Sequence, residues 1–164
     1  MKTMFLLFFL YSGLSYGSTP EAVASKYLEN FSSHRYSAAA KMIYCGEGLS
    51  EAELSDKYAG LSEELKFLDN EFGPVTQYNV SNDHMYVAAT LGCGSHDFLE
   101  TNLESAKVVV FGVIYNNKSP GYIVVKLISV NDKFLPITVD HGIPMDGLLS
   151  TARIMSVYKK LTEL

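Results

Sequence analysis

The strongest constraint on the fold is a change in the spacing of apolar residues at the segment Phe72-Gly73-Pro74. Before this segment, apolar residues recur every three or four positions, which is typical of one face of a helix. After it, short runs rich in β-branched and aromatic residues alternate with turn residues, which is typical of strands. Glycine and proline together predict that the helical half ends here. Helices followed by strands predict an α+β domain with helices packed on an antiparallel sheet.

The first two helices are expected between residues 19 and 43. Thr19 is predicted to cap the first helix, and Pro20 to occupy its first turn. A second, short helix is expected over residues 36–43, which are rich in alanine. The apolar stripe of the first helix consists of Val23, Tyr27, Leu28 and Phe31. This stripe should be its buried side.

A third helical segment follows, and Ser50 with Glu53 predicts a capping box at its start. Its apolar stripe consists of Leu54, Tyr58, Leu61, Leu65, Leu68 and Phe72. Gly60 followed by Ser62 favours a stop and a new start, so the segment is expected either as one helix or as two.

Four or five strands are expected after Pro74. They cover residues 75–80, 86–91, 108–115, 122–130 and 134–139. The run "VVVFGVIY", residues 108–115, is apolar at successive positions and predicts a central strand covered on both faces. Turn residues at 116–121 and 130–133 predict hairpins. Pro136 cannot donate a hydrogen bond to a neighbouring strand, which predicts that the last strand lies at an edge or contains a bulge.

The first seventeen residues have the three-part pattern of a secretory signal peptide. Lys2 supplies the positive start, residues 4–11 are an unbroken apolar run, and Ser15 and Gly17 are the small residues before a cleavage site. The apolar run is shorter than the roughly 20 residues that a membrane-spanning helix needs. We therefore predict a secreted or periplasmic protein, released by cleavage near Gly17.

The mature chain should form one domain over residues 18–144, followed by an extra C-terminal helix over residues 145–164. Two apolar stripes are expected on this helix: Leu148, Ala152, Met155 and Tyr158, and Ile154, Val157, Leu161 and Leu164. One explanation is a helix folded over the sheet or over a pocket mouth, and the other is contact with a partner, including a homodimer.

The chain has two cysteines, Cys45 and Cys93, each followed by glycine. In an exported protein such a pair predicts a disulfide. Two alternatives are a Cys93 nucleophile assisted by His96 or His141, and a zinc site at Cys45, Cys93 and His96. The consecutive Ser-His-Asp of residues 95–97 does not predict a catalytic triad, because adjacent side chains diverge.

A leading helix with "EAVASKYLENF", a short helix that begins at "RYSAAAKM" and a third helical segment that ends at "FGPV", followed by four or five strands, resemble the nuclear transport factor 2-like, or ketosteroid isomerase-like, superfamily. The resemblance covers about residues 20–144 and is greatest to small secreted bacterial domains. It implies a curved antiparallel sheet that forms a cone-shaped α+β roll, a pocket between sheet and helices, and pairing through the open sheet face. The superfamily includes isomerases, dehydratases and members that only bind or assemble, so the fold alone does not define an activity.

Two functions are considered. The favoured one is a non-catalytic domain that binds a small apolar ligand or a protein partner, with Tyr58, Tyr78 and Tyr86 as candidates for the pocket lining. The alternative is a lyase or isomerase of the ketosteroid isomerase kind. Its general base would be Asp140 or His141, since either group can have a shifted pKa in an apolar pocket. Otherwise these two residues form a turn after the last strand. A dry pocket with one strongly perturbed acid or histidine at its base would favour the enzyme, whereas a filled core beside an exposed apolar patch would favour the binding domain.

Charge and composition exclude further classes of function. The net charge of −5 and the absence of a basic cluster argue against nucleic acid binding, which depends on Lys and Arg. We expect no metal and no cofactor. Asn-x-Ser sequences at Asn30, Asn79 and Asn117 would be glycosylated only in a eukaryotic secretory pathway.

Overall fold

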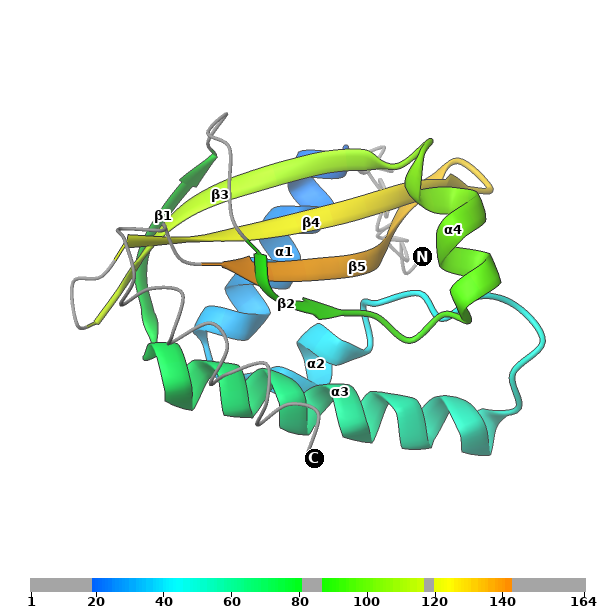
Figure 1. Cartoon of the computed structure of the whole chain (residues 1–164), viewed down its shortest axis with the longest axis horizontal. Coiled ribbons are helices and arrows are strands. Elements are labelled where there is room, and N and C mark those ends of the chain that lie inside the picture. Colours follow the sequence, from blue (N-terminus) through cyan, green and yellow to red (C-terminus); the bar gives the residue numbers. More distant parts are fainter. Residues whose placement is uncertain (1–18, 81–86, 117–119, 143–164) are drawn as a thin grey trace, which may run out of the picture.

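The computed structural model describes residues 19–80, 87–116 and 120–142. The expected signal peptide, Tyr86, Asn117 and the expected C-terminal helix lie outside the described residues. In order, the elements are α1 (Pro20–Ser32), α2 (Tyr36–Ala40), α3 (Glu51–Phe72), β1 (Val75–Val80), β2 (Val87–Leu91), α4 (His96–Leu103), β3 (Lys107–Tyr115), β4 (Pro120–Val130) and β5 (Lys133–Gly142) (Figure 1). The predicted α+β class, with helices and an antiparallel sheet, is confirmed.

Helix α1 begins as predicted. The Thr19 hydroxyl accepts a hydrogen bond from the Ala22 amide at 3.2 Å, and Pro20 occupies the first turn. The predicted stripe faces the core, because Tyr27, Leu28 and Phe31 are buried. Helix α2 also forms but is shorter than expected and ends at Ala40.

Helix α3 is one continuous helix of 22 residues, so the alternative of two helices is wrong. Its capping box is present, with Ser50 and Glu53 bonded to each other's backbone amides. Gly60 lies on the exposed side, where its cost of about 1 kcal/mol relative to alanine is offset by the packing of the apolar stripe. Gly73 ends the helix with a φ of 88°, a conformation that suits glycine.

The five strands form one antiparallel sheet in the order β1-β3-β4-β5-β2. The two predicted hairpins join β3 to β4 and β4 to β5, but β1 and β2 lie at opposite edges, so the strands form only a partial meander. The predicted 108–115 strand is an interior strand, since β3 lies between β1 and β4, but the prediction that both its faces are covered is wrong. β3 alternates between buried and accessible residues, and Val108 is 55% exposed.

Strand β5 differs from its prediction at two places. It lies between β4 and β2, and the register with β4 shifts where Lys126 pairs with Thr138 and Leu127 with Pro136. Pro136 therefore lies at a bulge and not at an edge, which confirms one of the two predicted alternatives. The strand also continues to Gly142, so the interpretation of Asp140 and His141 as a turn is wrong.

The core fills the space between the helices and one face of the sheet. Helix α1 packs against β3 and β5, and α2 packs against α3 (Figure 1). The largest fully buried side chains of the core include Tyr27, Phe31, Phe72, Phe111 and Tyr115. Close packing of such large rings joins the helical half to the sheet in a single core.

Candidate functional site

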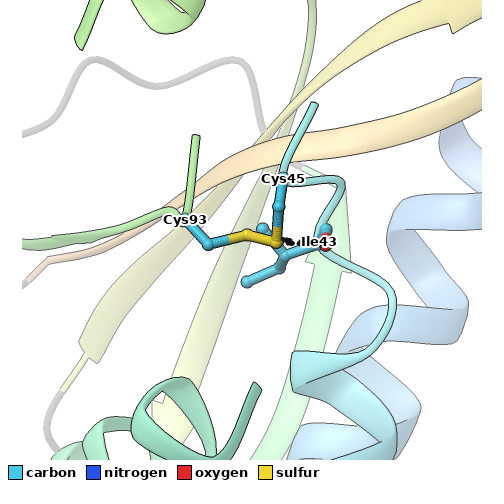
Figure 2. Close-up of a disulfide and its surroundings, with 3 residues drawn as sticks. All are labelled: Ile43, Cys45 and Cys93. Atoms are coloured by element: carbon cyan, nitrogen blue, oxygen red, sulfur yellow. Dashed lines mark hydrogen bonds between the residues drawn. A yellow bond between two sulfur atoms is a disulfide. The ribbon is translucent and has the colours of Figure 1, made fainter. Parts of the chain in front are cut away.

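The predicted disulfide is present between Cys45 and Cys93, across a sequence separation of 48 positions (Figure 2). It links the α2–α3 connection to the segment between β2 and α4, and both cysteines are buried. The Ile43 carbonyl oxygen lies 3.7 Å from Cys45 Sγ and 3.8 Å from Cys93 Sγ. Because sulfurs in a disulfide carry no proton, these are contacts rather than hydrogen bonds. The nucleophilic cysteine and the zinc site are therefore both wrong.

The glycines beside the cysteines allow the two segments to approach Phe98. Gly46 has a φ of 89°, and a Cβ atom there would lie 3.4 Å from the Phe98 ring. A Cβ atom at Gly94 would clash with the same ring. The Tyr44 amide also donates to the Pro136 carbonyl at 2.6 Å, which attaches the α2–α3 connection to β5.

The loop after Cys93 leads into a helix that the sequence did not predict. The Ser95 hydroxyl accepts a hydrogen bond from the Phe98 amide at 3.2 Å and caps α4, while Asp97 lies in the first turn. Ser95 and Asp97 therefore serve the start of a helix. The capping serine followed by an acid was the signal that could have predicted it.

Asp140 lies in β5 and is 2% exposed. Its Oδ2 atom forms an ion pair with Lys126 Nζ at 2.8 Å. The two residues are diagonal neighbours across β4 and β5, since Lys126 pairs with Thr138 and Val124 with Asp140. Asp140 Oδ1 and the Thr138 hydroxyl are buried without a hydrogen-bond partner among the described residues. The ion pair with Lys126 explains how an acidic side chain can be buried at this position.

His141 is the next residue along β5, so its side chain points to the opposite face of the sheet. It is fully buried, and its ring lies edge-on to Phe31 with 4.8 Å between centroids. Neither ring nitrogen has a hydrogen-bond partner among the described residues. Burial lowers the pKa of His141 to about 3, so the imidazole is neutral in the folded protein. Asp140 and His141 therefore do not form one site.

An open groove runs between α2 and α3, and we call it the α2–α3 groove. It consists of two hollows of about 590 and 670 Å³, and both are within the range of small-molecule sites. The two hollows share four lining residues, Ser37, Lys41, Ser62 and Glu63. One end is also lined by Leu54, Tyr58 and Ala59, among others, and the other by His34, Arg35, Tyr36 and Lys66, among others.

The tyrosines expected to line a pocket do not share one site. Tyr58 lines the α2–α3 groove. Tyr78 is 44% exposed on β1 and lines a separate hollow of about 310 Å³ over β1, β3 and β4. Neither Asp140 nor His141 lines any of these three hollows.

A polar cluster lies at one end of the α2–α3 groove. The Tyr36 hydroxyl donates to Asp69 Oδ2 at 2.7 Å. His34 Nδ1 lies 3.0 Å from the same carboxylate oxygen and 2.9 Å from the Tyr36 hydroxyl. The Asp69 side chain is 5% exposed and that of His34 is 52% exposed, so the cluster extends from the core to the surface. Burial, the hydrogen bond to Asp69 and its charge raise the pKa of Tyr36, which keeps the phenol protonated.

Sequence reasoning missed this cluster because its members are distant in the chain. Tyr36 and Asp69 are 33 positions apart, and helix packing alone brings them together. A signal was nevertheless present: Asp69 lies four residues after Leu65, on the apolar stripe of α3. An acid on such a stripe is buried with a partner or bound to a ligand.

Comparisons of the chain with protein-family models, with curated proteins and with solved structures give no match. Within the described part of the chain, no helix is both long and apolar enough to cross a membrane. The same residues contain no group of three His, Cys, Asp or Glu side chains placed to hold a metal ion. Of the Asn-x-Ser sequences, Asn30 is buried, whereas Asn79 is exposed on β1.

Proposed function

We propose that this protein is an exported, non-catalytic binding domain whose recognition surface is the α2–α3 groove. The observation that carries the proposal is the contrast between this groove and the interior. Two joined hollows of small-molecule size lie on the helical surface. The space beneath the sheet, in contrast, is filled by fully buried rings such as those of Phe31, Phe111 and Tyr115. A filled core beside an open groove favours binding over catalysis.

The ligand that suits this groove is a small molecule with an apolar part. At one end, Leu54 and Tyr58 are half-buried and pack against the core, which leaves part of each side chain to contact a ligand. Both hollows have volumes within the range of small-molecule sites. We therefore favour the small apolar ligand over the protein partner.

Export is supported by the disulfide, because such bonds persist in oxidising compartments such as the periplasm and the extracellular space. The signal peptide and cleavage after Gly17 stay predictions. Intact mass of the exported protein, with thiols alkylated before and after reduction, tests both. We expect a chain that begins at Ser18 and takes up two alkyl groups only after reduction. A chain that retains residues 1–17 would contradict the signal peptide.

Membership of the nuclear transport factor 2-like superfamily also stays a proposal. It is supported by three leading helices followed by an antiparallel sheet. The core is filled where that superfamily typically has a cone-shaped pocket. Pairing of two copies through the open sheet face, where Val108 is exposed, is a related prediction. Sedimentation velocity over a range of protein concentrations would detect such a dimer.

The second hypothesis, a lyase or isomerase with Asp140 or His141 as general base, finds less support. A general base must lie within hydrogen-bonding reach of the substrate proton. His141 is fully buried against Phe31, and Asp140 is buried in an ion pair with Lys126. The low pKa of His141 follows from burial in a packed core, which stabilises the neutral ring without exposing it to a substrate.

Binding of N-phenyl-1-naphthylamine, a neutral apolar fluorophore, tests the groove. We expect a saturable rise in its fluorescence with the native protein and a several-fold weaker affinity for Tyr58→Ser. The matched control is Tyr78→Ser, which removes a comparable ring from the hollow on the sheet. Loss of binding in the control variant alone would move the site to the sheet. No saturable binding by the native protein would refute the proposal.

A further inference from the structure

The two ends of the α2–α3 groove differ in charge. Arg35, Lys41 and Lys66 line the end that also contains His34, and Glu63 is the one acid in that lining. This local excess of cations contrasts with the net charge of −5 of the whole chain. A group of like charges in a cleft raises the local concentration of oppositely charged ligands, here anions.

Lys41 is the cation best placed to meet a ligand. It lines both hollows, so it lies where the apolar end meets the cationic end. It is exposed, and its ammonium group has no ion-pair partner among the described residues. Arg35, by contrast, is bonded to Glu29 and Asn30 at 3.0 Å each, and Lys66 lies 3.8 Å from Glu63. The ammonium group of Lys41 is therefore available to an anion.

His34 is held so that one ring nitrogen is available at the cationic end. The Tyr36 proton is donated to Asp69, and a carboxylate can only accept. His34 Nδ1 lies within hydrogen-bonding distance of Asp69 Oδ2 and of the Tyr36 hydroxyl oxygen. Nδ1 must therefore carry a proton and act as the donor in these contacts. This leaves Nε2 as the nitrogen that can meet a ligand, and it donates a hydrogen bond when the ring is protonated. The left-handed backbone of His34, with a φ of 58°, is a further sign of a fixed position.

We propose that the α2–α3 groove binds a small amphipathic anion, with its carboxylate or phosphate at Lys41 and His34 and its apolar body on Leu54 and Tyr58. This inference rests on the proposed function and adds the chemical class of the ligand. Asp69 acts as a positioning residue, because it contacts the His34 ring and does not line the groove, whereas Tyr36 both contacts this ring and lines the groove. A charge-assisted hydrogen bond from Lys41 then selects anions over neutral molecules of the same shape, and His34 Nε2 adds a second one when its ring is protonated.

Titration with three octyl compounds tests the inference. Octanoate, octyl phosphate and octanol share an apolar body and differ in the head group. Chemical shifts of ¹⁵N-labelled native protein give both the dissociation constants and the residues affected. We expect either anion to bind about tenfold more tightly than octanol, as one charge-assisted hydrogen bond would provide. The tighter of the two anions identifies the preferred head group. Binding of the anions should also weaken as salt is raised.

Variants separate the charge from the apolar surface. Lys41→Gln should weaken octanoate binding about tenfold and leave octanol binding unchanged. Its matched control is Lys133→Gln, which removes one exposed lysine at the β4–β5 turn and should change neither constant. Asp69→Asn should weaken anion binding and change its pH profile, because the carboxylate no longer fixes the ring. A purely structural role for Asp69 would leave the pH profile of binding unchanged.

The outcomes distinguish the inference from the proposal on which it rests. Octanol binding in the groove as tightly as both anions would overturn the anion site and leave the binding domain intact. Equal loss of octanoate affinity in Lys41→Gln and Lys133→Gln would also overturn it, since the effect would then be one of net charge. If none of the three compounds shifts groove residues, both the inference and the proposed function fail.

Discussion

Two histidines among the described residues, His141 and His34, occupy opposite environments. His141, in β5, is fully buried against Phe31, and neither of its ring nitrogens is hydrogen-bonded among the described residues. His34, between α1 and α2, is half exposed and has Nδ1 close to Asp69 and Tyr36. The first residue has a strongly lowered pKa and no access to solvent, whereas the second has access and oriented partners.

The difference shows why a perturbed pKa does not by itself define a site. Burial alone lowers the pKa of His141 to about 3. A binding or catalytic residue needs a free atom at a surface and neighbours that fix its position, and His34 has both. Changes at His141 should therefore alter stability and its pH dependence, while changes at His34 and its partners should alter binding. Variants at the two histidines and at their neighbours test this separation.

Removal of the disulfide should have the largest effect on stability. The bond joins the α2–α3 connection to the segment after β2, and β2 is the strand that pairs with His141 in β5. For a loop of 48 positions, the chain-entropy model gives about 4 kcal/mol. We expect the double variant Cys45→Ala/Cys93→Ala to lose about this much free energy of unfolding, measured by urea denaturation at pH 7. A loss below about 1 kcal/mol would show that the bond contributes little beyond the packed core.

Stability should fall as the pH decreases from 7 to 5, because of His141. The pKa is about 3 in the folded protein and 6.5 is the ordinary value expected after unfolding. Between these values the unfolded state binds a proton that the folded state does not, so stability rises with pH. The slope approaches about 1.4 kcal/mol per pH unit below pH 6, which gives a loss of about 2 kcal/mol at pH 5. His141→Leu should remove most of this slope in urea denaturation series.

A residual slope in His141→Leu equal to that of the native protein would contradict the assignment to His141. His34→Gln is the matched control, because it removes the half-exposed histidine at the groove. It should leave the slope largely intact while weakening binding of octanoate. The pair of variants thus separates stability from binding, which is the difference between the two environments.

Loss of the Tyr36 hydroxyl should have a smaller effect on stability than the changes above. Tyr36→Phe keeps the ring and removes the hydrogen bond to Asp69 at 2.7 Å. We expect a loss of about 1 kcal/mol in the free energy of unfolding, as for a hydrogen bond to a charged group that stays partly satisfied. Asp69 retains His34 as its partner. A loss above about 3 kcal/mol would show that Tyr36 is part of the core rather than of a cluster that positions His34.

The features predicted correctly from the sequence depend on residues close together in the chain. Thr19 before Pro20, Ser50 with Glu53, and Gly73 each define a helix end through local backbone hydrogen bonds or conformation. The disulfide was predictable for another reason, since two cysteines permit only one intramolecular pairing. Such signals need no knowledge of which elements meet.

The features that were missed depend on long-range packing. The order of the strands places β2 beside β5 and not beside β1, which no local pattern specifies. Pairing with β2 also extends β5 through Asp140 and His141, because Thr90 pairs with Asp140 and Ala89 with His141. The cluster of His34 and Asp69 likewise forms only when α3 packs beside α2. A charged residue on an apolar stripe was the single local indication of it.

Gly60 shows how local and long-range effects compete, and it gives the smallest expected effect. Glycine favours a helix end at this position, but α3 continues through it because the apolar stripe packs on both sides of Gly60. A Cβ atom at Gly60 would meet nothing within 4 Å. We therefore expect Gly60→Ala to stabilise the protein by about 0.5–1 kcal/mol, measured by urea denaturation. The gain should be the same at pH 7 and pH 5, since Gly60 is exposed on α3, whereas His141 is buried in β5. A gain present at only one of the two pH values would show that α3 and the buried histidine are coupled, and the separation of the two regions would then fail.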